Sequence, residues 1–418
     1  MELIKKFLTT ITIQSFGSGA IFLAVFLIAR VLGPEEQGRF SEVKAFVDLL
    51  VVGLLLGLPQ SFVFGINKLR IARGQLSRWS MQYGVIAIFL VTAVLWAFAA
   101  TQSSFLPIRN AGFADALLLA LAIAGLVVHA LLRGILLTAD DGWRFSFITI
   151  LPTLFLCATI SLLLTANRFE PVLTYAIAGM LTACIAIRYA RPFLSDPAGA
   201  ALPWKDLLAN GGTAFVQSTV MALQPFLTIT LLRQAGGGYE DVAFFSLAAY
   251  IYQASILPLT MVSPLLFNRW SSAMTMNDVV LDLKNLAWPL VVIVFGVTVA
   301  WHAVPVLIPL IFGTSYIGST RAIQLILLGV PFMYVAFVGM PALMAIGKFR
   351  INALMAIVRL AACSLIFFSL LVEYPGESKS EQAAMAWTSA ELLMAFMVAA
   401  VLAKNFHVPA KREIDTST

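Results

Sequence analysis

The sequence predicts an all-helical, polytopic membrane protein with about twelve transmembrane helices in two six-helix lobes. Three observations support this prediction: the composition, the length of the apolar runs, and a duplicated pattern. Of the 418 residues, 60% are hydrophobic and only 11% are charged, whereas about a quarter of the residues in a soluble domain are charged. Apolar runs recur along the chain, and each is long enough to cross about 30 Å of hydrocarbon as a helix.

The predicted spans follow one another along the whole chain. They cover residues 7–32, 40–66, 79–101, 113–138, 145–166, 171–190, 207–233, 241–267, 285–311, 321–346, 351–372 and 383–403. The ninth span contains three prolines, which leaves open a kink or a break because proline removes a backbone donor. We count it as one span. The first run is too long for the core of a signal peptide, so we expect it to be retained as a helix.

The basic residues are distributed unevenly between the predicted loops. If the N-terminus is inside, 17 of the 27 Lys and Arg residues fall on cytoplasmic segments and 7 on the other side. Arg30, Arg133 and Arg359 lie within spans. An excess of Lys and Arg marks cytoplasmic loops, which places both termini in the cytoplasm. The net charge of +6 is therefore a topology signal and does not predict a nucleic-acid partner.

A pattern in the first span is repeated in the seventh. Gln14 precedes Arg30 by 16 residues, and Gln217 precedes Arg233 by the same interval. On a straight helix, 16 residues at 100° each place the two side chains about 160° apart. The glutamine and the arginine of each pair therefore face one cavity only if a helix bend intervenes, and otherwise the glutamine alone lines it.

Each repeated arginine leads into a glycine-containing acidic hinge. The first hinge, residues 33–41, reads GPEEQGRFS, and the second, residues 236–246, reads GGGYEDVAFFS. A proline follows the last serine of each hinge by 18 residues, and the matched markers are separated by 203 or 205 residues. Six helices per repeat return the chain to the same side, so the symmetry axis runs along the membrane normal, with a cavity expected between the lobes.

The repeat also predicts the domain boundaries. We expect an N-terminal lobe at 1–190, a cytoplasmic linker at 191–206, a C-terminal lobe at 207–404 and a cytoplasmic tail at 405–418. No G-x-x-x-x-G-K-[ST] loop occurs, so we expect no ATP hydrolysis and no cofactor. A membrane polysaccharide polymerase is a rival class, but the predicted outer loops are too short to carry a catalytic site. We therefore expect a transporter and no enzymatic activity.

Three segments of the sequence resemble a known family. They read IARVLGPEEQGRFS, IFGTSYIGSTRAIQLILLG and ALMAIGKFRINALMAIVRL. They are similar to the polysaccharide and O-antigen flippases of the multidrug/oligosaccharidyl-lipid/polysaccharide exporter superfamily. The resemblance implies two six-helix lobes around a central cavity, alternating access, and transfer of an undecaprenyl-diphosphate-linked oligosaccharide across the cytoplasmic membrane of a bacterium. The chain shows no helix pair beyond twelve, which argues against the lipid II flippase branch.

Charged residues in the spans are the candidate site. A charge at mid-helix costs roughly 2.5 to 3.5 kcal/mol on insertion scales, so each requires a reason. Guanidinium groups offer paired donors that suit a lipid diphosphate. The candidates for substrate binding are Arg133, Arg359, His129, Arg30, Arg233, Gln14 and Gln217. Snorkelling of the arginines to the headgroups is the competing explanation.

The span acids are candidates for coupling transport to a proton or sodium ion. Asp48 lies one turn after Lys44 and is expected to pair with it, and Glu391 has no local partner on its own helix. Glu391 is therefore either an ion-coupling site or the partner of Arg359 in a buried pair. A multidrug cation exporter remains the alternative function, and it would require carboxylates to dominate the cavity. For either function, we expect the protein to be a monomer in contact with membrane lipids.

Overall fold

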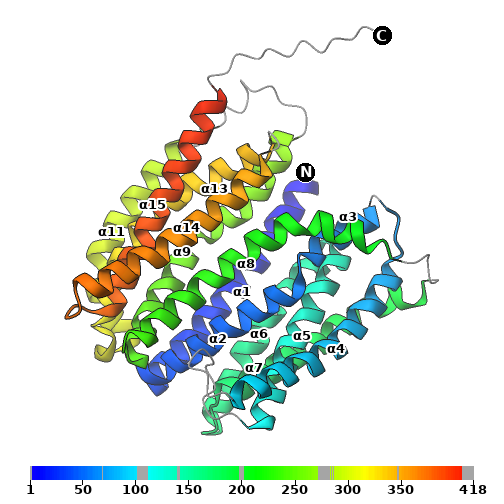
Figure 1. The fold of residues 1–418 in the computed structure, drawn as a ribbon, viewed down its shortest axis with the longest axis horizontal. Helices are drawn as coiled ribbons and strands as arrows, with labels where there is room; N and C mark the ends of the chain where they lie inside the picture. The colour runs from blue at the N-terminus through cyan, green and yellow to red at the C-terminus, as the bar shows by residue number, and fades with distance from the viewer. Residues whose placement is uncertain are drawn as a thin grey trace. The chain divides into compact units, whose positions relative to one another are not determined.

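The computed structural model is helical almost throughout the residues that it describes (Figure 1). These are residues 2–67, 69–100, 112–138, 142–196, 202–271, 283, 285, 287–345 and 348–406. The helices are α1 (Glu2–Leu32), α2 (Pro34–Leu55), α3 (Leu58–Asn67), α4 (Arg73–Ala100), α5 (Phe113–Leu137), α6 (Gly142–Thr165), α7 (Pro171–Ala190), η1 (Arg191–Ser195), α8 (Trp204–Gln234), α9 (Tyr239–Ser271), α11 (Ala287–Phe312), η2 (Thr314–Tyr316), α12 (Ser319–Leu327), α13 (Gly329–Ala345), α14 (Phe349–Glu373) and α15 (Lys379–Phe406).

Within the described residues, 11 segments are long and apolar enough to cross a membrane. They correspond to eleven of the twelve predicted spans. The remaining prediction, 241–267, coincides with α9, which is a continuous helix of 33 residues but is not among those 11 segments. The chain is therefore a multi-pass membrane protein with 11 or 12 spans, as the sequence predicted.

Two predicted spans are interrupted. The span 40–66 is divided between α2 and α3 because Leu56 and Gly57 adopt left-handed backbone angles, with φ of 49° and 70°. The span 321–346 is divided at Leu328, between α12 and α13. Pro331 follows closely, and a proline cannot donate the backbone hydrogen bond that would continue the preceding helix. The proline-containing span 285–311, in contrast, is one unbroken helix, α11.

The described residues form two compact units. Unit 1 comprises Met1–Ser246 with Leu310–Tyr316, and unit 2 comprises Leu247–Pro309 with Ile317–Thr418. The predicted lobe boundary at 191–206 follows the sequence repeat, and it stays a prediction.

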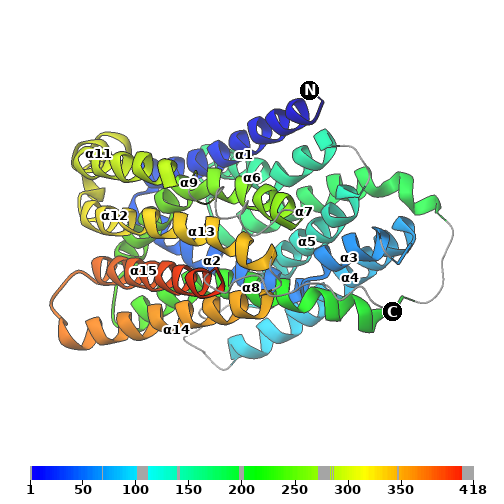
Figure 2. The ribbon, with the colours of Figure 1, turned by 90° about the horizontal axis from the view of Figure 1, so that it is seen from above.

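The core of unit 1 is built around α5. This helix packs along α4 and α7, and it also contacts α2 and α3 (Figures 1 and 2). Most of its side chains are buried, including Leu119, Ile123 and Leu131. An apolar helix that is covered on nearly all sides is typical of a central helix in a bundle. Its few partly exposed positions therefore mark the parts of α5 that other helices cover least.

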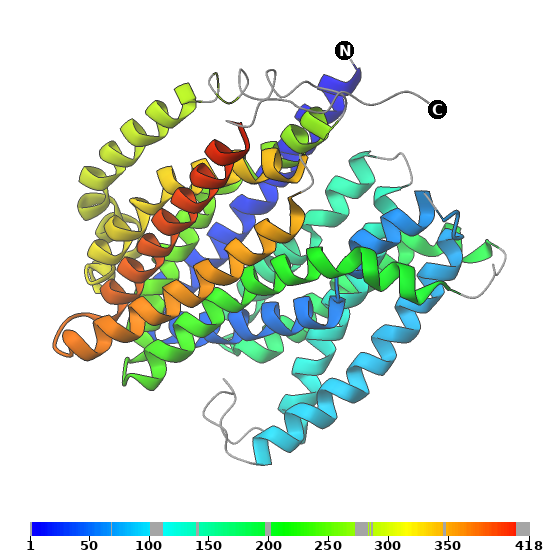
Figure 3. The same cartoon turned by 45° about the horizontal axis from the view of Figure 1, so that its top comes forward.

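Unit 2 is organised around α15. The helices α14 and α15 lie side by side, and α12 and α13 also pack on α15 (Figure 3, orange and red at the end of the chain). The α15 face that meets them carries small and buried residues, among them Ala383, Ala390 and Val398. Small side chains let helix backbones approach closely where no hydrophobic effect drives association in lipid.

Candidate functional site: the charges within the spans

Unit 2 contains a buried ion pair between neighbouring helices. Nη2 of Arg359 on α14 donates a hydrogen bond to Oε1 of Glu391 on α15. The two residues are only 6% and 0% exposed. The sequence left two explanations open for Glu391, and its pairing with Arg359 is confirmed. Its role in ion coupling stays a prediction.

Aromatic residues enclose this ion pair. The ring of Tyr252 on α9 lies edge-on to Trp387, with 6.0 Å between centroids, and Cζ of Arg359 lies 6.0 Å from the Trp387 ring. Gly329 lies beside the same two side chains, because a Cβ there would be 3.4 Å from Cγ of Glu391 and from Cε2 of Tyr252, an ordinary van der Waals contact. An apolar enclosure strengthens the attraction between opposite charges, and it also increases the cost of leaving either charge alone.

The pair leaves some of its polar atoms unsatisfied. Among the described residues, Nε of Arg359, Oε2 of Glu391 and the hydroxyl of Tyr252 have no hydrogen bond of ordinary geometry. Buried polar atoms without partners are rare in proteins, and each calls for an explanation. Here one donor, one acceptor and one hydroxyl converge on a single cluster, which we call the α14–α15 ion-pair cluster. Such a cluster has the chemistry to exchange a proton or to accept a small ion.

Arg133 lies in different surroundings in unit 1. It is partly exposed on α5, on the same face as Leu126, Ala130 and Leu137. Within the described parts of the chain it makes no hydrogen bond and no ion pair. Because Arg133 is only four residues from the end of α5, snorkelling to the headgroups is the explanation that competes with substrate binding.

His129 lies one turn before Arg133 and is buried. Its Nε2 lies 2.8 Å from the carbonyl oxygen of Ile148 on α6. A carbonyl oxygen only accepts hydrogen bonds, so Nε2 is the protonated nitrogen in this contact. The hydrogen bond joins α5 to α6 and gives His129 a structural function in the core. Substrate binding by this residue stays a prediction.

Asp48 pairs with Lys44 one turn earlier on α2, as the sequence predicted. Both side chains are partly exposed. Together with Glu391, this accounts for both acids that the sequence offered as ion-coupling candidates. Each of them has a basic partner, whereas no acidic partner for Arg133 is found in the described residues. The unbalanced charge among these candidates is therefore positive.

Arg233 and its hinge form a local cluster at the end of α8. Nη1 of Arg233 donates to the carbonyl oxygen of Gly237 at 3.0 Å, and its guanidinium lies 4.0 Å from the centroid of the Tyr239 ring. Nε lies 4.0 Å from Oε1 of Glu42 on α2. These contacts, all within the protein, hold Arg233 at the end of α8. Whether it also binds substrate stays a prediction.

The two duplicated hinges pack against each other. A Cβ at Gly38 of the first hinge would lie 2.0 Å from the carbonyl oxygen of Tyr239 in the second, so only glycine permits this approach. Arg39 of the first hinge lies 5.2 Å from the Tyr239 ring centroid. The leading glycines, Gly33 and Gly236, have nearly the same backbone angle, with φ of 83° and 82°. The repeat read from the sequence thus keeps this backbone angle, although one residue separates α1 from α2 and four separate α8 from α9.

The other candidates are positioned as follows. Arg30 is exposed in the last turn of α1, and its Nη1 is 3.1 Å from the point where Gly313 would carry a Cβ. Gln217 is partly exposed on α8. The side chain of Gln14 lies outside the described residues. Among the candidates, the structure joins Arg359 to Glu391 directly, and it gives Arg30 and Arg233 separate environments.

Sequence reasoning missed the aromatic members of the α14–α15 ion-pair cluster. Tyr252 and Trp387 are 135 residues apart in a chain rich in apolar residues, and neither belongs to a spaced motif. Trp387 lies one turn before Glu391 on α15, a spacing that the sequence shows, whereas only the tertiary structure brings Tyr252 on α9 to the ion pair. Tyr239 lies within the repeated hinge, so its position, but not its contact with two arginines, was visible in the sequence.

Comparison with known structures reveals the fold of the chain. It has the fold of transporters of the MOP superfamily, with two lobes. An inward-facing multidrug resistance MATE family transporter of this superfamily matches with a TM-score of 0.73 at 15% identity, covering 95% of this chain and 98% of that one. The lipid II flippase MurJ, in an inward closed conformation, matches with a TM-score of 0.71 at 13% identity, covering 95% and 88%.

A third structure belongs to a transporter from Pyrococcus furiosus. This MOP superfamily member, described as having a binding pocket of reverse polarity that suggests a different function, matches with a TM-score of 0.64 at 15% identity, covering 96% and 94%. No protein-family model and no curated protein matches the sequence. At such low identities the likeness defines the fold, and the cargo has to be argued from the residues of this chain.

Proposed function

We propose that this protein is a flippase that moves an undecaprenyl-diphosphate-linked oligosaccharide across the bacterial cytoplasmic membrane by alternating access. The proposal is supported by the transporter fold and by one observation about charge. Among the candidates within spans, both acids are paired with bases, whereas Arg133 has no partner in the described residues. An uncompensated positive group within a span suits a carrier of anions.

The chemistry of Arg133 suits a diphosphate. A guanidinium is always charged and offers paired N–H donors at the spacing of phosphate oxygens. At an effective dielectric constant near 20, one close contact between unit charges is worth about 4 kcal/mol before desolvation. This attraction acts against the cost of keeping an arginine in a span, which for Arg133 is below the mid-helix value of roughly 2.5 to 3.5 kcal/mol because it lies near the end of α5. Binding of an anionic head would thus offset part of that cost.

We propose that the proton or sodium ion that drives transport binds at the α14–α15 ion-pair cluster. Protonation of Glu391 would release Arg359 from its partner, and Tyr252 packs beside Gly329 together with Glu391. Coupling by this route requires a buried carboxylate whose charge state changes during the cycle. The second candidate, Asp48, is partly exposed beside Lys44. Its carboxylate is therefore less desolvated, and its affinity for protons should be altered less.

Deletion of the gene tests this function. We expect the diphosphate-linked oligosaccharide to accumulate in the inner leaflet, measured by mass spectrometry of extracted lipids. Complementation with Arg133→Ala should fail, while Arg133→Lys should restore part of the export because it keeps the charge. Arg168→Ala is the matched control, since this exposed arginine lies in the connection between α6 and α7. Wild-type surface polysaccharide with Arg133→Ala would contradict the proposal.

The alternative is a cation-coupled multidrug exporter, which the high structural similarity to a MATE family transporter favours. The same deletion separates the two functions. Unchanged lipid-linked glycans together with greater sensitivity to cationic dyes would support drug export. In that case the buried carboxylate of Glu391 would be the residue expected to bind the cation, and Glu391→Gln should abolish dye efflux.

A further inference from the structure

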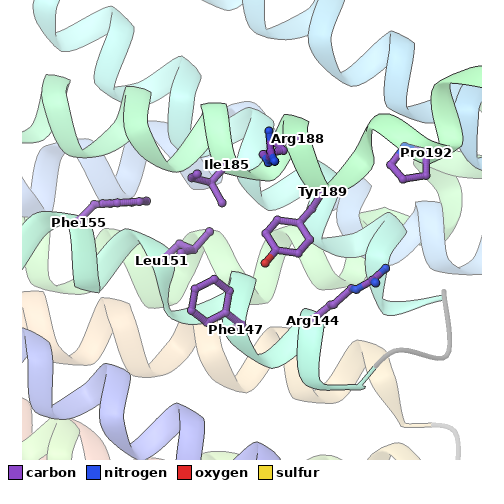
Figure 4. Close-up of a pocket in the computed structure, with 8 residues that line it drawn as sticks. All are labelled: Arg144, Phe147, Leu151, Phe155, Ile185, Arg188, Tyr189 and Pro192. Carbon is purple, nitrogen blue, oxygen red and sulfur yellow. The ribbon is translucent and has the colours of Figure 1, made fainter.

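A groove lies between α6 and α7 (Figure 4), and none of the candidate residues discussed above is among those that line it. Its volume is about 490 Å³. The residues that line it are Arg144, Phe147, Leu151, Phe155, Ile185, Arg188, Tyr189 and Pro192. Four come from α6, three from α7, and Pro192 from the short η1 turn that follows.

The groove combines two chemistries. Arg144 and Arg188 supply positive charge, and both are exposed. From Arg144, the apolar side chains Phe147, Leu151 and Phe155 follow along α6 at intervals of three and four residues, which places them on one face. In Figure 4, Phe155 lies at one end of the groove, whereas Arg144 lies toward the other. The apolar wall is about 12 Å long at 1.5 Å per residue.

The apolar wall is only partly covered by the protein itself. Phe147, Phe155, Ile185 and Tyr189 pack against a small buried cluster that includes Leu151, yet each remains partly exposed. The ring of Tyr189 leans on Phe147, with 6.4 Å between centroids. The groove is therefore open to the outside, is lined by aromatic and aliphatic side chains, and carries two arginines. Such a groove fits an elongated molecule with one anionic end.

We propose that this groove binds an anionic glycerophospholipid from the membrane. Its phosphate lies against Arg144 and Arg188, and one acyl chain lies along Phe147, Leu151 and Phe155. Arginine binds phosphate through paired charge-assisted hydrogen bonds, and both arginines belong to the predicted cytoplasmic side. Anionic lipids attract basic residues near the membrane surface. The lipid would join the ends of α6 and α7, whatever the cargo of the transporter.

The proposal is tested by lipid titration of the purified full-length protein. Phosphatidylglycerol or phosphatidylcholine is added to the protein in neutral detergent, and bound lipid is counted by native mass spectrometry alongside the melting temperature. We expect phosphatidylglycerol to bind at least tenfold more tightly and to raise the melting temperature. The double variant Arg144→Gln with Arg188→Gln should lose this preference, and Arg168→Gln, at the opposite end of the same helix pair, should keep it.

A second variant keeps the test decisive if the double variant does not fold. Ile185→Trp fills the apolar wall without changing the charge, so we expect it to weaken phosphatidylglycerol binding at least fivefold. The charge-preserving pair Arg144→Lys with Arg188→Lys should retain the preference for the anionic lipid. Equal binding of both lipids by the wild type, or phosphatidylglycerol binding that survives both the glutamine and the tryptophan changes, would overturn the proposal. Equal stabilisation by inorganic phosphate would overturn the assignment to a lipid.

Discussion

Arg133 and Arg359 are both arginines within apolar helices, but their surroundings differ. Arg359 is buried against Glu391 and two aromatic rings, whereas Arg133 is partly exposed and has no partner in the residues that the structure describes. The first charge is neutralised within the protein, so its removal should affect folding most. The second is compensated only by something outside the protein, which is the expected property of a site for an anion or a headgroup.

The largest effect is expected from breaking the buried pair. Arg359→Ala leaves Glu391 charged and without a partner in an apolar enclosure, which costs about 3 to 5 kcal/mol of folding free energy. The measurement is the free energy of unfolding in detergent or bilayers. In the double variant Arg359→Met with Glu391→Leu, no charge remains, so stability should return to near the wild-type value. A double variant as unstable as Arg359→Ala would show that the unpaired charge of Glu391 is not the cause of the instability.

Arg133→Met should change the folding stability in the opposite direction to Arg359→Ala. Removing an uncompensated charge from α5 should stabilise the protein by about 1 to 2 kcal/mol, less than the roughly 2.5 to 3.5 kcal/mol for a helix centre, because Arg133 is near the helix end. Export should nevertheless be lost. Unfolding measurements and the surface-glycan assay are made on the same variant. If Arg133→Met destabilises the protein, a hidden partner exists and the contrast with Arg359 fails.

The smallest effect is expected at the duplicated hinge. Arg233→Lys replaces a planar group over Tyr239 by a compact ammonium and removes the bond to Gly237, which should cost about 0.5 to 1 kcal/mol. Arg39→Lys is the matched variant, since Arg39 is farther from the same ring and about half exposed, and its cost should be smaller. Melting temperatures of the two variants give the comparison. A larger loss for Arg39→Lys would reverse the assignment of Arg233 as the anchor.

The hinges show which features the sequence determines. The spacing between Gln and Arg, the leading glycines and the acidic residues were all visible as a repeat. The structure then gives Gly33 and Gly236 the same left-handed angle. Local conformation follows from local residue types, because glycine alone adopts such angles without strain. The packing of one hinge on the other through Gly38 and Tyr239 depended on distant parts of the chain and was not predictable.

The sequence alone determined the helical membrane fold, because a continuous apolar run of about 20 residues satisfies its backbone groups in lipid by forming a helix. It also identified which charged residues required an explanation, and it offered Arg359 as one possible partner of Glu391. Only the tertiary structure decided between pairing and isolation, since α14 and α15 bring residues 32 positions apart into contact, while α5 leaves Arg133 on a partly open face. Charge balance in a membrane is a property of neighbouring helices, and one-dimensional spacing does not specify which helices become neighbours.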